Sequence, residues 1–163
     1  MTQFEPAVWR LAHVLLAGRW SCATAESCTG GLLAAACTSV AGSSEWFERG
    51  FVTYSNESKS EMLGVEPSLI VNHGAVSAEV ATAMAVGALA RARAEFAVSV
   101  TGIAGPAGGT ADKPVGTVWM ALSRRHDETL VERLQLTGTR SQVREQTVHH
   151  ALARLWERAS AGR

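Results

Sequence analysis

The sequence predicts an α/β fold, namely a three-layer α/β/α sandwich with a mixed, mostly parallel sheet. Two observations carry this prediction: strand-like apolar runs alternate with helical repeats over the first 100 residues, and two further strand-like runs then follow each other as a hairpin. The chain has 163 residues, of which 47% are hydrophobic, so it can bury a full core. We therefore expect a single domain over residues 1–163.

The first elements alternate between helix and strand. Apolar residues recur at helical spacing over residues 6–18, with a proline where a first helical turn accepts it. The small residues of SCATA, 21–25, suit a buried strand. TGGLLAAACTSV, 29–40, then indicates a helix that ends at AGSS, 41–44.

The strand-to-helix order then repeats. GFVTYS, 50–55, is rich in β-branched and aromatic residues and predicts a strand, and residues 56–65 predict a short helix. Residues 77–93 carry an apolar stripe and predict a helix with Ser77 as its N-cap. The nearly all-apolar EFAVSV, 95–100, predicts a strand that is covered on both faces.

The last third of the chain begins with a long irregular segment. Residues 101–116 contain five glycines and two prolines, and loops of this length inside compact domains are usually functional or disordered. TVWMALS, 117–123, and ETLVERLQL, 128–136, predict a hairpin, and residues 140–160 predict a closing helix. The antiparallel hairpin is what makes the predicted sheet mixed.

Composition and charge exclude several classes of partner. Fifteen basic and fifteen acidic residues cancel to a formal charge of zero, so the sequence shows neither the basic footprint of a nucleic-acid binder nor that of a membrane-surface protein. Cys22, Cys28 and Cys37 match no zinc spacing, and we interpret them as reduced thiols. The N-terminus lacks a signal-peptide pattern, and no apolar run is long enough to span a membrane. We expect a cytoplasmic protein.

Three polar turns follow predicted strands: ESCTGG at 26–31, YSNESK at 54–59 and TGIAGPAGG at 101–109. In an open α/β sheet, ligands bind beyond the carboxyl ends of the strands, where such turns meet. We therefore expect one shared site.

In the first turn, Ser27 is a candidate nucleophile. If a helix begins near Thr29, the unpaired amides of Thr29, Gly30 and Gly31 point into the turn and can hold an oxyanion. The plainer interpretation is that Ser27 is only an N-cap, which is common for a serine before a helix. Cys28 is a rival nucleophile, but no histidine lies nearby in sequence to activate its thiol.

In the second turn, Lys59 is a candidate general base. If Asn56 caps the helix, Lys59 is its third residue, where the helix dipole and any burial lower the pKa of the ammonium group. A solvated surface lysine is the plainer interpretation. Tyr54, the only tyrosine, ends the preceding strand and is interpretable as a core aromatic with its hydroxyl at the rim.

Two other features suit anions. Gly42, Ser43 and Ser44 offer amides and hydroxyls for a phosphate, but equally suit the end of a helix. Arg140 and Arg144 lie one turn apart at the start of the last helix, so they can grip an anion together, although surface charge is the commoner explanation.

Four segments, TAESCTGG, VAGSSEWFERGFVTYSNESK, GAVSAEVA and TGIAGPAGGTADKPVGTVW, closely resemble the CinA C-terminal-domain family. The resemblance runs from about Thr24 to the final helix. Stand-alone members of this family include enzymes that deamidate nicotinamide mononucleotide, a reaction of pyridine nucleotide recycling. The resemblance thus implies hydrolysis of that substrate to nicotinic acid mononucleotide and ammonia, with neither a metal nor an organic cofactor.

The resemblance also implies roles for individual residues. Ser27 is the nucleophile, Lys59 its base and Tyr54 a supporting hydroxyl. The glycine-rich loop forms a second ligand-binding wall with Thr101, Gly102, Ile103, Ala104 and Gly105. The family further suggests a homodimer or a higher homo-oligomer. A non-catalytic nucleotide-binding regulatory module of the same fold is the alternative, because a fold determines a pocket more firmly than an activity.

Overall fold

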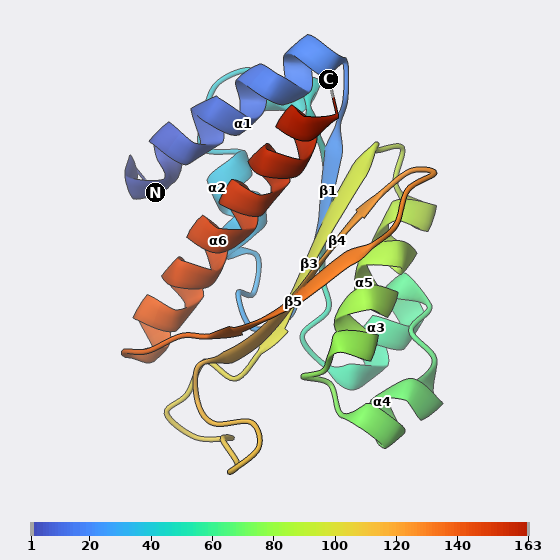
Figure 1. Ribbon diagram of the computed structural model, residues 1–163, viewed down its shortest axis with the longest axis vertical. Coiled ribbons are helices and arrows are strands. Elements are labelled where there is room, and N and C mark those ends of the chain that lie inside the picture. The colour runs from blue at the N-terminus through green and yellow to red at the C-terminus, as the bar shows by residue number, and fades with distance from the viewer. Residues whose placement is uncertain (1, 163) are drawn as a thin grey trace.

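A computed structural model describes residues 2–162 and contains a five-stranded sheet with helices on both faces (Figure 1). The two terminal residues of the expected domain, 1 and 163, lie outside this range. The order across the sheet is β2-β1-β3-β4-β5. The strands are β1 (Cys22–Glu26), β2 (Phe47–Val52), β3 (Phe96–Gly102), β4 (Thr117–Arg124) and β5 (Leu130–Gln135).

The sheet is mixed, as predicted. β1 pairs in parallel with both β2 and β3, whereas β4 is antiparallel to β3 and β5 is antiparallel to β4. β5 therefore points the same way as β3, and β4 alone runs in the opposite direction. The prediction of a mixed sheet in which most strands share one direction is confirmed.

Two helical layers cover this sheet, which confirms the three-layer sandwich (Figure 1). On one face α1 and α6 lie side by side, and α2 packs against both of them. The apolar residues of these three helices form one core with the sheet. On the other face α3, α4 and α5 form a second core. The helices are α1 (Glu5–Gly18), α2 (Leu32–Cys37), α3 (Asn56–Leu63), α4 (Pro67–His73), α5 (Ala78–Arg91) and α6 (Arg140–Ala161), with short 3-10 turns at Thr2–Phe4 and Ser43–Glu45.

Side chains of β1 alternate between the two cores. Cys22 packs into the core beneath α1, α2 and α6, whereas Ala23 and Ala25 pack beneath α5. All five residues of the strand are buried, because both faces of a central parallel strand are covered. The residue that follows the strand, Ser27, continues the alternation toward the side of α3 and α5.

Two predicted boundaries are wrong. The helix expected over 29–40 is only Leu32–Cys37, because residues 27–30 form a turn in which the Gly30 amide donates to the Ser27 carbonyl (3.1 Å). The strand expected over 50–55 is Phe47–Val52, since its pairing with β1 ends at Val52.

The cap of α3 and the element after it also differ from the prediction. Ser55, not Asn56, caps α3, and its hydroxyl accepts from the Ser58 amide at 3.1 Å. The sequence analysis assigned no element to residues 66–76, where the structure has α4, a seven-residue helix that begins with a proline. Such a short helix offers too few repeats for its apolar spacing to be recognised.

The remaining predicted elements are present, with ends shifted by one or two residues. β3 extends to Gly102, so Thr101 and Gly102 belong to the strand and not to the irregular segment expected from residue 101. Ser77 caps α5, and its hydroxyl accepts from the Val80 amide at 3.2 Å. The hairpin of β4 and β5 is present. α6 begins at a capping box formed by Thr139 and Gln142.

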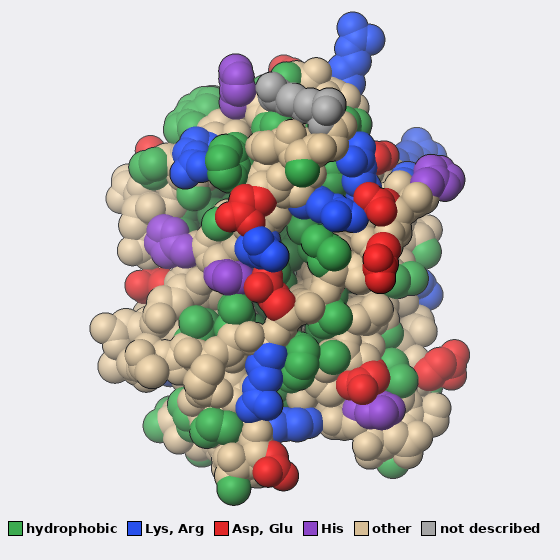
Figure 2. Space-filling view, in the orientation of Figure 1, with side chains coloured by type: hydrophobic (Ala, Val, Ile, Leu, Met, Phe, Trp, Pro, Cys, Tyr) green, Lys and Arg blue, Asp and Glu red, His purple; other side chains and the backbone are tan. Residues whose placement is uncertain are grey.

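Charges of both signs are interspersed on the face shown in Figure 2, in line with the balanced composition. Over residues 2–162, no helix combines the length and the apolar character that crossing a bilayer requires.

Candidate functional site

The carboxyl ends of β2, β1 and β3 meet at one edge of the sheet. Glu26, the last residue of β1, pairs with Val52 on one side and Val100 on the other. The turns after these strands therefore lie side by side, as expected from the sequence. A cavity of about 220 Å³ opens between them.

Ser27 and Lys59 meet in this cavity. The Lys59 Nζ atom lies 3.1 Å from Ser27 Oγ, although 32 residues separate the two positions. Only 1% of Lys59 and 9% of Ser27 is exposed. Lys59 is thus not a solvated surface lysine, and Ser27 does not cap α2.

Three backbone carbonyls hold the amine of Lys59 in place. Nζ lies 2.9 Å from the carbonyl oxygen of Thr53 and 3.4 Å from those of Tyr54 and Ser55. Burial lowers the pKa of Lys59 from its ordinary value. A neutral amine has two N–H groups, which these carbonyls can accept, and its lone pair then remains for the hydroxyl proton of Ser27.

Cys28 also lines the cavity but is poorly suited to be the nucleophile. Burial is the main cause that raises the pKa of its thiol to about 12, and the nearby charge of Glu26 adds to the increase. Since the thiolate is the reactive form, the thiol of Cys28 is inert near neutral pH.

Glu26 was not singled out from the sequence, yet it organises the turn at residues 27–31. Its buried carboxylate accepts from the Gly31 amide at 3.1 Å and from the Thr29 hydroxyl at 2.6 Å. The Gly30 amide is already bonded to the Ser27 carbonyl. The expectation that the amides of Thr29, Gly30 and Gly31 all face a ligand is therefore wrong for the two glycines.

Tyr54 and Arg140 lie together at the rim of the cavity. Tyr54 is 60% exposed, so it is not a core aromatic, and its hydroxyl accepts from Arg140 at 2.9 Å. Arg140 also donates to the Gly105 carbonyl at 2.9 Å. The guanidinium thus joins the turn after β2 to the glycine-rich loop through two neutral acceptors.

Arg144 does not share this position. It donates to the Thr29 carbonyl at 2.8 Å and so holds the turn at residues 27–31 against α6. The two arginines contact different segments, and the expected joint grip on one anion is not what the structure shows.

The predicted site residues other than the AGSS segment fall into two groups. Those that line the cavity are Ser27, Tyr54, Lys59, Thr101, Gly102, Ala104 and Arg140. Those that lie in the same turns without lining it are Thr29, Gly30, Gly31, Ile103 and Gly105. Cys28, Asn56, Ala75 and Val76 complete the lining.

Of these, Ala75 and Val76 were missed as site residues. They belong to the segment between α4 and α5, which the sequence analysis left without an element, and the Ala75 carbonyl accepts from the Thr101 hydroxyl at 2.8 Å. The GAVS motif at 74–77 was a signal for this segment, but its position near Ser27 in the cavity depends on the packing of α4. Asn56 was considered only as a helix cap.

Gly42, Ser43 and Ser44 lie at the opposite edge of the sheet. They precede β2, whose first residue, Phe47, pairs with Cys22 at the start of β1. The five residues of β1 separate that edge from Ser27, a distance of roughly 16 Å. Within one protomer the AGSS segment does not line this cavity, so a role in the site of its own protomer is not supported.

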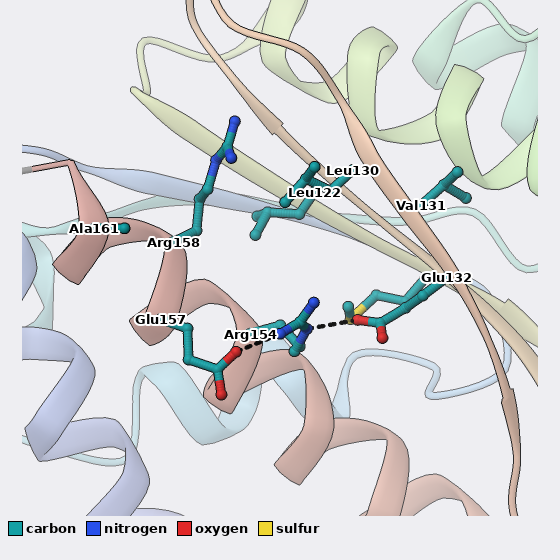
Figure 3. A pocket seen from close by; sticks show the side chains of 9 residues that line it. Leu122, Leu130, Val131, Glu132, Arg154, Glu157, Arg158 and Ala161 are labelled. Atoms are coloured by element: carbon teal, nitrogen blue, oxygen red, sulfur yellow. Dashed lines mark hydrogen bonds and ion pairs between the residues drawn. The ribbon is translucent and has the colours of Figure 1, made fainter.

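A second cavity, of about 230 Å³, lies between α6 and the β4–β5 hairpin (Figure 3). Leu122 and Leu130 form part of its apolar lining, and Arg154 points between Glu132 and Glu157, to both of which it is bonded. It contains no predicted site residue. Across residues 2–162, no three His, Cys, Asp or Glu side chains are grouped to hold a metal ion.

Comparisons with known proteins agree with this architecture. Nicotinamide-nucleotide amidohydrolase PncC of Escherichia coli (strain K12) is 54% identical over 134 residues, which cover 82% of this chain and 81% of that protein. The PncC protein of Enterobacter agglomerans is 52% identical over 142 residues, or 87% of each chain. The crystal structure of competence/damage inducible protein CihA from Agrobacterium tumefaciens matches with a TM-score of 0.91 at 46% identity, over 93% of each chain.

A family model, described as the CinA C-terminal domain, matches residues 5–159, from the start of α1 into the last turn of α6. The match includes every strand of the sheet and all three turns around the cavity. This chain belongs to the CinA C-terminal domain family.

Proposed function

We propose that this protein hydrolyses the carboxamide of nicotinamide mononucleotide to nicotinic acid mononucleotide and ammonia, with Ser27 as nucleophile and Lys59 as general base. The observation that carries the proposal is the 3.1 Å contact between Ser27 Oγ and the buried Lys59 Nζ. The substrate is suggested by the relatives named nicotinamide-nucleotide amidohydrolase, which are 52–54% identical over most of the chain.

In the acylation step, Ser27 Oγ attacks the carboxamide carbon while Lys59 takes the hydroxyl proton. The ammonium of Lys59 then gives that proton to the departing nitrogen, so that the carbon–nitrogen bond breaks and ammonia leaves. The product of this step is an ester between the nicotinoyl group and Ser27.

In the deacylation step, Lys59 is neutral again and takes a proton from water. The hydroxide formed attacks the ester carbon, and the proton returns from Lys59 to Ser27 Oγ as the acid is released. One base thus serves both halves of the reaction, because the amine stays beside Ser27 Oγ throughout.

The negative charge of each tetrahedral intermediate needs hydrogen-bond donors. Within residues 2–162 the amides of Cys28 and Thr29 have no acceptor, whereas those of Gly30 and Gly31 are bonded within the turn. We assign the oxyanion site to Cys28 and Thr29.

Arg140 is the residue that we assign to the substrate phosphate. It lines the cavity, and its two bonded acceptors, the Tyr54 hydroxyl and the Gly105 carbonyl, carry no charge. A phosphate dianion makes stronger charge-assisted bonds to a guanidinium than neutral oxygens do. Tyr54 then supports the reaction by orienting Arg140.

The experiment is to incubate the pure protein with nicotinamide mononucleotide and measure ammonia, with free nicotinamide in parallel. We expect the nucleotide to be hydrolysed with a much higher kcat/KM, since remote phosphate and ribose contacts position the amide. Equal values for the two compounds would remove the phosphate-binding role of Arg140. Binding of the nucleotide without ammonia release would favour the regulatory module instead.

A further inference from the structure

A buried carboxylate stands directly before the nucleophile and takes no part in the proton transfers of the proposed reaction. Glu26 is the last residue of β1 and is 0% exposed. Burying a charge is costly unless it is fully hydrogen-bonded, so the partners of Glu26 indicate its role.

The carboxylate bonds to the segment that follows Ser27. Oε2 accepts from the Thr29 hydroxyl (2.6 Å) and from the amides of Gly31 (3.1 Å) and Leu33 (3.0 Å). Oε1 accepts from the Ala34 amide at 2.8 Å. These four bonds fix the path of the chain from the turn at residues 27–31 into the first turn of α2.

The same bonds decide which amides remain for a ligand. An unoccupied N-terminus of α2 would itself attract an anion, but the carboxylate of Glu26 already occupies it. The two donors left in the turn are the amides of Cys28 and Thr29, and the side chain of Thr29 is the group held most closely by Glu26.

We propose that Glu26 is a positioning residue, whose carboxylate holds the amides of Cys28 and Thr29 where the oxyanion forms. This inference rests on the proposed function, since it deepens the assignment of the same site. Glu26 does not touch the substrate and exchanges no proton. It acts by holding the turn in place. A displacement of about 1 Å in the turn is enough to weaken the stabilisation of the transition state.

If Glu26 were only a structural cap of α2, its removal would have a different effect. Removing such a cap lowers the melting temperature and leaves the folded protein fully active. A positioning residue lowers kcat in the folded protein, because the oxyanion is formed only in the reaction, and leaves KM nearly unchanged.

The first test is Glu26→Gln, which keeps the shape and one acceptor oxygen. At a temperature where circular dichroism shows the variant to be folded, we expect kcat to fall by about 10- to 100-fold, with KM for nicotinamide mononucleotide within about threefold. The midpoint of the pH profile, which belongs to Lys59, should not move. A kcat within twofold of the unmodified protein would overturn the proposal.

The second test is Thr29→Val, which removes the shortest of the four bonds without changing the size of the side chain. We expect a loss of about tenfold in kcat. The double variant should lose less than the product of the two single losses, because both changes disturb the same contact. If Glu26→Gln fails to fold, Thr29→Val alone decides, and an unchanged kcat would overturn the proposal.

Ser99→Ala is the matched control. The Ser99 hydroxyl is also fully buried and donates a 2.6 Å bond, to the Ala81 carbonyl, away from the cavity. This variant should lose stability but keep its kcat. If its kcat falls as far as that of Thr29→Val, the effect is a general consequence of a lost buried bond, and the proposal is wrong.

A fluorophosphonate probe separates this inference from the proposed function. Ser27 Oγ attacks phosphorus, fluoride leaves, Lys59 takes the hydroxyl proton, and the phosphonyl oxygen occupies the oxyanion site. We expect Glu26→Gln to slow this labelling by a factor similar to its loss in kcat. Labelling that depends on Glu26 in a protein that does not hydrolyse the nucleotide would refute the proposed function alone. Hydrolysis with kcat and labelling unaffected by Glu26→Gln would refute the positioning role alone.

Discussion

Two short segments rich in serine and glycine, ESCTGG at 26–31 and AGSS at 41–44, have similar compositions but opposite positions in the fold. The first follows β1 and lies at the carboxyl edge of the sheet, beside Lys59. The second follows α2 and leads into β2 at the amino edge. A segment that follows one of the parallel strands lies at the edge where the cavity opens, whereas a segment that leads into such a strand lies at the opposite edge. The order of elements, and not the composition, therefore decides on which edge a segment lies.

The largest expected loss of activity comes from a substitution in the first of these two segments, ESCTGG. Ser27→Ala should lower kcat by about 10⁴-fold or more, because among residues 2–162 no other hydroxyl is bonded to Lys59 Nζ. The variant should fold, since the Ser27 hydroxyl caps no helix. Ammonia release in single turnovers is the measurement. Ser43→Ala is the matched control at the other edge, and equal losses in both variants would contradict the comparison.

The next effect concerns the base. Lys59→Arg keeps the positive charge but cannot accept a proton at ordinary pH, so it should lose about 10²- to 10⁴-fold in kcat, nearly as much as Lys59→Ala. Steady-state kinetics of both variants provide the measurement. Substantial activity in Lys59→Arg would show that Lys59 is a charge anchor, and the Ser27–Lys59 pair would have to be abandoned.

A smaller effect is expected at the rim. Arg140→Ala should raise KM for nicotinamide mononucleotide and lower kcat/KM by about 10- to 100-fold, because it removes charge-assisted bonds to the phosphate. For free nicotinamide, which has no phosphate, the same variant should change little. An equal loss for both compounds would mean that Arg140 acts on the reacting amide or on the fold.

The smallest effects on kcat/KM are expected at Cys28 and Ser44, which the sequence suggested as an alternative nucleophile and as a phosphate ligand. Cys28→Ala should keep kcat/KM within about twofold, because the thiol is protonated near neutral pH and the Cys28 amide, which we assign to the oxyanion, is retained. Ser44→Ala should also stay within twofold, since it lies at the opposite edge of the sheet. A severe loss in Cys28→Ala would transfer the nucleophile to the thiol.

The layered fold was predictable because its signals are local. The apolar periodicity of the sequence predicted α1, α5 and α6, and the continuous apolar run EFAVSV predicted β3. Boundaries were less predictable, because they depend on partners that are distant in sequence. The start of α2 is set by the carboxylate of Glu26, and the end of β2 by its pairing with Glu26.

Candidate site residues were predictable where the residue type and the turn that carries it were enough to single them out. Ser27 and Lys59 were singled out from strand-to-helix turns, yet their contact depends on how α3 packs against α5, which no local pattern encodes. Glu26 was missed because an acidic residue ending a strand is indistinguishable from a surface carboxylate until its burial is known. Arg140 was predicted to bind an anion, but its bond to Tyr54 was not foreseen because it joins segments 86 residues apart.

The most direct test of the central claim, that a buried and partly neutral Lys59 activates Ser27, is the pH dependence of kcat/KM for nicotinamide mononucleotide. Protonated Lys59 cannot act as a base, so kcat/KM should fall tenfold per pH unit below the pKa of Lys59 and reach a plateau above it. Because burial lowers the pKa of Lys59, the midpoint should lie clearly below the ordinary lysine value of 10.5. A profile in which kcat/KM falls as the pH rises toward 10.5, or whose midpoint lies at the ordinary lysine value of 10.5, would contradict the account.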